Sequence, residues 1–138
     1  MSYKFLDHAT DAIIEITAKD IKEAFAVAAD AEINLTLDQD KVEEKDQKKF
    51  SARGKDLRYL LFSWLEEIPF LLITEGFAIR RIEFDIIENE GFTINATAFG
   101  ETLDVHKHNF KVEIKAPTFY DMEIKTNDQV YMKFLLDL

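Results

Sequence analysis

Apolar residues recur at helical spacing in two stretches of the chain. Over residues 20–33 they stand three or four positions apart, and Asp20 followed by Glu23 resembles a capping box. Over residues 57–68 the same spacing is denser, and Pro69 then predicts a kink or an end to the helix. The sequence therefore predicts two amphipathic helices.

Most of the remaining chain alternates apolar and polar residues, which is the period of a half-buried strand. Two alternating stretches within residues 81–98 flank the turn residues Asn89-Glu90-Gly91, so a hairpin is predicted there. The charged stretch 38–49 fits either an edge strand or a solvated loop. Further strands are expected at 3–6, 12–18, 111–115, 119–125 and 130–136.

These elements describe an α+β fold, in which mainly antiparallel sheet carries two packed helices. The length of 138 residues is typical of one domain, so we expect a single domain over residues 1–138. Hydrophobic residues make up 47% of the chain, and four Gly and two Pro are too few for a disordered protein.

The chain has no cysteine, which excludes disulfides, thiolate metal sites and cysteine nucleophiles. A bound metal would be held by oxygen or imidazole. The N-terminus has no signal-peptide core, and no apolar run approaches about 20 residues. We therefore expect a cytoplasmic protein that does not associate with a membrane.

The formal net charge is −10, from 27 acidic and 17 basic residues. This charge repels a phosphate backbone, so strong direct binding of nucleic acid is not expected. An acidic surface fits a cation or a basic protein partner, and it is also a common means of solubility.

The sequence lacks a Gly-x-Ser-x-Gly elbow, a phosphate-binding glycine loop and an HExxH helix. Candidate chemistry therefore rests on carboxylates and three histidines.

Asp7 and Asp11 bracket the predicted turn between the first two strands, with His8 between them. Such oxygens suit Ca²⁺ or Mg²⁺, and the imidazole would let Mn²⁺ or Zn²⁺ compete. From spacing alone, an ordinary turn with local hydrogen bonds is the stronger explanation of the same residues.

A further carboxylate, Asp137, ends the last predicted strand, where a charge beside the core needs a partner or a cation. The terminal carboxylate of Leu138 follows one residue later. If the last strand lies beside the second, Asp137 would meet Asp11; otherwise it is an exposed chain end.

A third polar group surrounds Glu101, His106 and His108. On a strand the two histidines would share a face and could hold zinc, whereas on a loop they would be solvated. Lys115 is either a site residue or a lysine that protects a strand edge.

Five motifs follow one another along nearly the whole chain. They are Asp7-His8-Ala9-Thr10-Asp11-Ala12, Leu60 to Gly76, Gly100-Glu101 with Asp104 and His108, Lys115-Ala116-Pro117-Thr118-Phe119-Tyr120, and Asp137-Leu138. In this order they resemble the archease family. Two of them depart from the family pattern: Ala9-Thr10 reverses its Thr-Ala and Ala12 replaces its Ile, while Phe119-Tyr120 replaces its Tyr-His.

The resemblance implies a small non-catalytic protein that assists an RtcB-type RNA ligase. That ligase joins tRNA halves with GTP and Mn²⁺, and archease promotes its guanylylation and multiple turnover, through a contact expected to be transient. The resemblance also implies a divalent metal ion (Ca, Mg or Mn) at Asp11 and Asp137, with Asp7 and the Leu138 carboxylate as further candidates. His8 is expected to accompany these carboxylates, and Glu101, His108 and Lys115 are expected to line the same region and to shape the contact with the ligase.

Two other functions remain open from sequence. A metal-dependent hydrolase would use the same carboxylates to activate water, although the acidic charge opposes an anionic substrate. A general chaperone or modulator of RNA-modifying enzymes would need an exposed apolar patch rather than a polar strand end.

Overall fold

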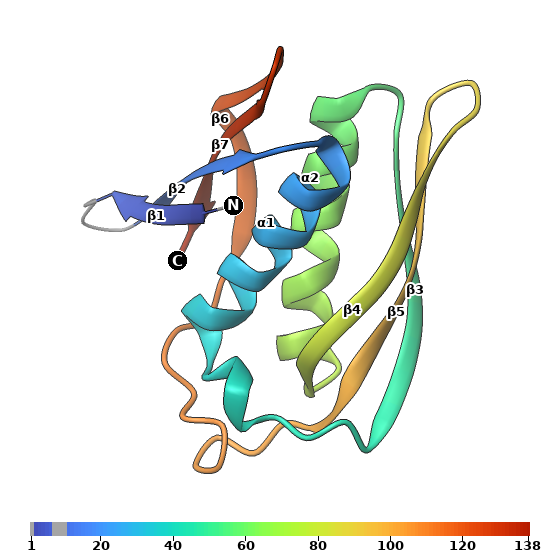
Figure 1. Ribbon diagram of the computed structural model, residues 1–138. Coiled ribbons are helices and arrows are strands. Elements are labelled where there is room, and N and C mark those ends of the chain that lie inside the picture. Colours follow the sequence, from blue (N-terminus) through green and yellow to red (C-terminus); the bar gives the residue numbers. More distant parts are fainter. Residues whose placement is uncertain (1, 7–10) are drawn as a thin grey trace.

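The computed structural model describes residues 2–6 and 11–138 (Figure 1). The elements are β1 (Ser2–Leu6), β2 (Asp11–Ala18), α1 (Ile21–Thr36), the 3-10 turn η1 (Gln39–Lys41), β3 (Asp46–Gly54), α2 (Leu57–Pro69), the π-helical turn η2 (Phe70–Thr74), β4 (Phe77–Glu88), β5 (Phe92–Thr102), β6 (Ala116–Thr126) and β7 (Val130–Asp137).

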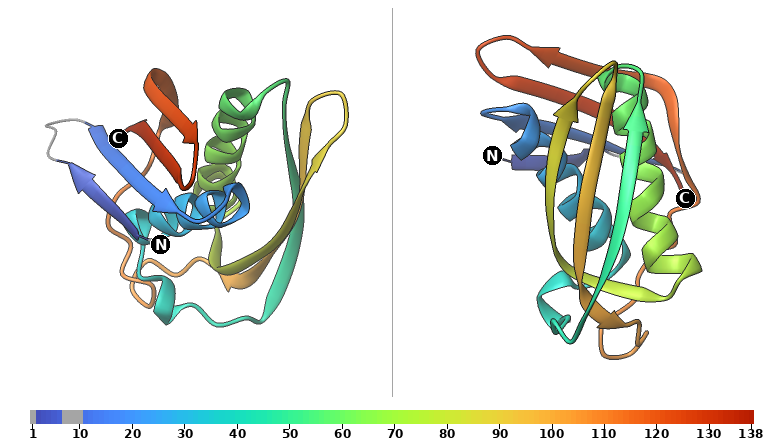
Figure 2. Two further views of the ribbon diagram at one scale, coloured as in Figure 1. Left: turned by 45° about the horizontal axis from the view of Figure 1, so that its top comes forward. Right: turned by 90° about the vertical axis from the view of Figure 1, so that its right-hand side faces the viewer.

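The strands form two antiparallel sheets with the helices between them. One sheet has the order β1-β2-β7-β6 and the other β3-β5-β4. Helix α1 contacts β2 and β4, and α2 contacts β3 and β6, so each helix touches both sheets (Figure 1). The right-hand view of Figure 2 shows the three-stranded sheet in front of both helices. The predicted α+β class is confirmed.

Trp64 on α2 joins these layers. Its indole N–H donates to the carbonyl oxygen of Phe25 on α1 at 2.9 Å. Its ring stacks on Phe50 of β3, with centroids 5.6 Å apart, and meets Phe84 of β4 at 4.9 Å. The indole is fully buried, and its polar N–H is satisfied, as a buried tryptophan requires.

The predicted helix starts are confirmed. The Asp20 side chain accepts the backbone N–H of Glu23 at 2.8 Å, and Asp56 accepts that of Tyr59 at 3.0 Å. At Pro69 the α-helical pattern ends and passes into η2, because proline has no N–H to donate. Both helix starts therefore follow the sequence pattern, whereas α1 continues to Thr36, beyond the predicted end at residue 33.

The predicted hairpin is also present. Glu90 and Gly91 have positive φ values of 52° and 117°, as a tight turn between β4 and β5 requires. The charged stretch 38–49 divides between the two expectations. Its first part holds η1 and a loop, and its last part begins β3, an edge strand.

The predicted strand at 111–115 is wrong, because this segment is a loop. Its alternation resembles a strand because Ile114 is buried while its neighbours are not. At the start of the segment, the backbone N–H of Lys111 donates to the carbonyl oxygen of Thr36 at the end of α1. Side-chain burial can follow a period of two without a neighbouring strand to complete a ladder.

Among the described residues, no helix combines the length and the apolar character needed to cross a membrane.

Candidate functional site

Asp11 and Asp137 lie directly opposite each other where β2 and β7 pair. The two strands run antiparallel, so the start of one meets the end of the other. Side chains of directly opposed residues stand on the same face with Cβ atoms about 5 Å apart. The structure thus brings together the two carboxylates whose adjacency the sequence left open.

This carboxylate pair stands on the outer face of the four-stranded sheet. In β2 the buried positions begin at Ala12 and recur at every second residue, so Asp11 belongs to the other face. On that face Glu15 is opposite Lys133, which is a pairing of opposite charges. Asp11 opposite Asp137 is a pairing of like charges, which is unfavourable in a sheet unless a cation or donor compensates it.

The strand order places Lys115 beside the same pair. β7 lies between β2 and β6, and Ala116, the first residue of β6, is opposite Asp137. The backbone N–H of Lys115 donates to the carbonyl oxygen of Asp137 at 2.8 Å. The strand-end group is defined here as Asp11, Asp137 and Lys115.

Two predicted site residues, Asp7 and His8, lie outside the described residues. The described part of the chain contains no group of three or more histidine or acidic side chains arranged to hold a metal ion. The pair Asp11 and Asp137 supplies two carboxylate side chains, whose oxygens suit a hard divalent cation. The Leu138 carboxylate stays a prediction.

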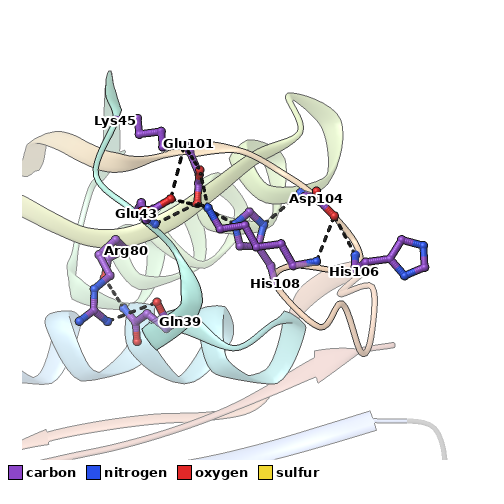
Figure 3. Close-up of polar contacts among 9 residues, drawn as sticks. Gln39, Glu43, Lys45, Arg80, Glu101, Asp104, His106 and His108 are labelled. Atoms are coloured by element: carbon purple, nitrogen blue, oxygen red, sulfur yellow. Dashed lines mark hydrogen bonds and ion pairs between the residues drawn. The ribbon is translucent and has the colours of Figure 1, made fainter.

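Glu101 and His108 meet in a second, separate group (Figure 3). Glu101 is 8% exposed and His108 is fully buried, and the Nε2 atom of His108 lies 2.9 Å from Oε2 of Glu101. The same oxygen accepts the backbone N–H of Glu43 at 2.9 Å. Lys107 Nζ lies 2.8 Å from it and Lys45 Nζ lies 3.6 Å from the other oxygen.

The hydrogen bonds of His108 determine its tautomer. Its Nδ1 atom lies 3.0 Å from the backbone nitrogen of Asp104 and accepts that N–H, so it carries no proton of its own. In the neutral ring the proton is then on Nε2, which donates to Glu101. The imidazole has no free nitrogen for zinc, so the predicted histidine pair is not a metal site.

Charge and hydrogen bonding together keep Glu101 ionised. Its pKa is lowered to about 2, first by the hydrogen bond from Lys107 and then by the backbone N–H of Glu43, against the opposing effect of burial. The turn that carries His108 is held by Asp104, whose side chain accepts the backbone N–H groups of His106 and Lys107 at 3.0 Å each.

The predicted site residues thus fall into two groups rather than one. The side chains of Glu101 and His108 contact each other and residues of the 43–45 and 104–107 segments, none of which belongs to the strand-end group. Figure 1 shows the end of β5 at the lower edge of the molecule and the C-terminus higher, with the orange loop between them. The expectation that one region contains all these side chains is not supported by their contacts.

Sequence reasoning missed Lys107 and Glu43, which complete the ion-pair network around Glu101. Lys107 stands between His106 and His108, so its position in a polar turn was visible. One of its two carboxylate partners, Glu43, is 64 positions away in the chain, and pairing over that distance leaves no local pattern.

Comparison with known proteins gives consistent matches along the whole chain. A model of the archease protein family matches residues 3–138. Protein archease of Pyrobaculum calidifontis is 36% identical over 140 residues, covering 99% of this chain and 95% of that protein. Protein archease-like of Dictyostelium discoideum is 33% identical over 129 residues, covering 91% and 85% of the two chains.

A solved structure has the same fold. The solution structure of Methanobacterium thermoautotrophicum protein 1598 superposes with a TM-score of 0.79 and 28% identity. The match covers 99% of this chain and 98% of that one. Both sheets and both helices of the present structure thus lie within the matched region.

Proposed function

This chain belongs to the archease family, and from that premise we propose that it is a non-catalytic activator of an RtcB-type RNA ligase in tRNA splicing. It would act in the cytoplasm by promoting guanylylation of the ligase and its repeated turnover. The contact would be transient, because an activator of many turnovers must be released.

The observation that carries this proposal is the opposition of Asp11 and Asp137 across β2 and β7. Two carboxylates on one face fit the oxygen chemistry of Ca²⁺, Mg²⁺ or Mn²⁺, and their mutual repulsion is relieved by a bound cation. Asp7 and the Leu138 carboxylate are proposed as additional ligands. A bound metal would supply positive charge at this strand end and fix the two side chains in one arrangement.

The location of the pair suits an insertion into a partner. Asp137 is exposed, and the pair lies at the end of two strands on the outer face of the sheet. A ligase that binds GTP and Mn²⁺ presents positive charge at its active site. Carboxylates placed there would help position a metal ion or the GTP phosphates, and positioning with charge neutralisation provides most of the catalysis in phosphoryl transfer.

The remaining predicted site residues are proposed to have two different roles, direct contact with the ligase and indirect support. Lys115 adjoins Asp137 through its backbone, and His8 precedes Asp11 in sequence, so both are proposed to contact the ligase. Glu101 and His108 are proposed to act indirectly, because their side chains are buried. They hold the loop that leads from β5 to Lys115.

The test measures the rate at which the cognate ligase becomes guanylylated with GTP and Mn²⁺, in the presence of substoichiometric amounts of this protein. We expect the native protein to accelerate guanylylation and the Asp11→Ala and Asp137→Ala variants to lose the effect. Asp85→Ala is the matched control, since Asp85 is an exposed carboxylate on β4 of the other sheet.

Three results would count against the proposal. Absence of acceleration by the native protein would remove the ligase role. Loss of acceleration in Asp85→Ala would show that the effect depends on overall negative charge and not on this carboxylate pair. Acceleration that is unaffected at Asp11 and Asp137 would separate the carboxylate pair from function. Phosphodiesterase turnover with added Mn²⁺ would then favour the hydrolase alternative.

A further inference from the structure

A cluster of aromatic rings lies where α2 begins and packs against β6. The rings of Phe62 and Phe119 stack in parallel, with centroids 4.2 Å apart and planes 9° apart. Tyr59, one helical turn before Phe62, meets the Phe119 ring at 5.0 Å. Tyr59 is 42% exposed, so the cluster reaches the surface. These three residues, together with Tyr120, which follows Phe119 on β6, are called the aromatic patch below.

The backbone of β6 is distorted at this patch. Its pairing with β7 changes register between Thr118 and Glu123, and Asp121 has a positive φ of 60°. Tyr120 within this bulge is 74% exposed, more than any other large apolar side chain in the described residues. Bulges redirect side chains, and a non-glycine residue with positive φ is strained, so the strand loses stability where it presents this ring.

Two cations border the aromatic patch. The Lys55 ammonium lies 4.4 Å from the centroid of Tyr59, and the Arg58 guanidinium lies 5.4 Å from that of Phe119. Both are exposed, and neither forms an ion pair with a carboxylate in the part of the chain that is described. Each of these cations lies over an aromatic ring, and of the two rings Tyr59 is exposed and Phe119 is half-buried.

The carboxylates nearest in sequence are already engaged. Asp56 caps α2 by accepting the backbone N–H of Tyr59. Asp121 forms an ion pair with Lys133 at 3.0 Å. Lys55 and Arg58 therefore keep their charge available to an outside anion.

We infer that the aromatic patch, with Lys55 and Arg58, binds a short stretch of single-stranded nucleic acid. The exposed ring of Tyr120 provides a face on which an unpaired base stacks, and the neighbouring cations bind the phosphates beside it. Arg58 can do this while it remains over Phe119, because one guanidinium nitrogen donates to the Phe119 carbonyl oxygen at 3.4 Å and the other N–H groups at its edge stay available. The overall acidity makes this binding weak and strongly salt-dependent.

This inference is independent of the proposed ligase role. It uses α2 and β6 residues, whereas the ligase proposal uses the carboxylates of β2 and β7. A single strand held on the protein would be an RNA end or loop rather than a duplex, because bases within a duplex have no free faces. The strand-end group and the aromatic patch can thus be tested separately.

The test is fluorescence anisotropy of labelled oligouridylate and oligodeoxythymidylate of about 12 nucleotides, a length that covers a typical single-strand site. Titration of the full chain at low salt should show binding of both, with affinity falling as salt rises. Tyr120→Ala and Arg58→Gln should each weaken binding about tenfold, the effect of losing one stacked base or one phosphate contact. A blunt duplex of the same length should bind less tightly.

Two matched variants control for exposure and charge. Phe70→Ala removes an aromatic ring that is 47% exposed on η2, and Lys49→Gln removes an exposed cation on β3. Neither should change the affinity. Circular dichroism melting should show that Tyr120→Ala is folded, and Lys55→Gln provides a second variant whose exposed side chain is outside the strained strand.

Several outcomes would overturn the inference. They are the absence of binding at low salt, equal losses in the Phe70→Ala or Lys49→Gln variants, and competition by inorganic polyphosphate as strong as that by the oligonucleotide. A Tyr120→Ala variant that loses ligase activation, in a protein with no affinity for single strands, would identify the patch as a protein interface instead.

Discussion

The Nε2 atom of His108 donates to Oε2 of Glu101 across 2.9 Å, in a region from which water is largely excluded. This bond connects the end of β5 to the loop that leads into β6. Since His108 also accepts the backbone N–H of Asp104, the neutral imidazole satisfies both of its nitrogens. The pair is therefore a structural clamp that needs no protonated histidine.

Replacement of His108, one of the two clamp residues, should destabilise the fold. His108→Ala removes a fully buried ring and leaves Glu101 without one of its donors, so we expect the free energy of unfolding to fall by about 3 kcal/mol. Urea denaturation followed by circular dichroism measures this. His106→Ala is the control in the same turn, where an exposed side chain should change stability by less than about 0.5 kcal/mol. A fully stable His108→Ala variant that fails to activate the ligase would place the imidazole at the partner surface.

The low pKa of Glu101 predicts an acid-sensitive contribution to stability. The pKa is about 2 in the folded protein against an ordinary value of 4.5, so the unfolded chain binds a proton first as the pH falls. The stabilisation is complete above about pH 4.5 and is lost between there and about pH 2.

Urea midpoints between pH 7 and pH 2.5 measure this contribution in the native protein and in Glu101→Gln. The difference between the two proteins should shrink as the pH falls. The pKa of Asp38 is also lowered to about 2, by Asn109, Lys41 and Lys111. Because Asp38 titrates in both proteins, the difference between them isolates the contribution of Glu101. A difference that does not vary with pH would show that the carboxylate charge contributes nothing.

Local patterns predicted most of the elements but not every strand. The two helices and the β4–β5 hairpin were predictable because capping residues, helical spacing and turn residues are all local. A strand was wrongly predicted at 111–115 because burial of Ile114 between exposed neighbours imitates strand alternation. The backbone N–H groups of this segment form hydrogen bonds only at its two ends. A strand requires a partner, and a period of two does not reveal one.

The candidate site was predictable in residue type and less so in arrangement. The opposition of Asp11 and Asp137 depends on β2 pairing with β7, a long-range choice that sequence leaves open. Burial of His108 depends on the turn set by Asp104. The exposure of Tyr120 depends on a bulge in β6, which has no distinctive residue in the sequence. Each of these arises from tertiary pairing rather than from local preference.

The carboxyl group of Glu32 on α1 is completely buried, and neither of its oxygens has a hydrogen-bond partner within the described structure. Burial raises its pKa well above the ordinary value of 4.5. The folded protein therefore holds a proton that the unfolded chain releases, so this group costs stability increasingly as the pH rises above about 4.5.

Glu32→Leu should thus stabilise the protein, by about 2 kcal/mol at pH 7. Thermal unfolding at pH 5 and pH 8 measures the effect, and the gain in melting temperature should be larger at pH 8. Glu32→Gln is the companion variant, since it keeps the shape of the side chain and cannot ionise. A lower melting temperature for Glu32→Leu at pH 8 would show that the carboxyl makes favourable contacts.

The like-charge pair at the strand ends predicts a stability response to divalent cations. Without metal, Asp137→Asn should raise the free energy of unfolding by about 0.5 kcal/mol, because it removes repulsion from Asp11. With Ca²⁺ or Mn²⁺ at about 100 times its dissociation constant, the native protein should gain about 2.7 kcal/mol and the variant much less. Thermal unfolding with each cation, and again after chelation, measures both effects. Asp85→Asn should respond to metal as the native protein does, whereas an equal response in Asp137→Asn would place any bound cation elsewhere.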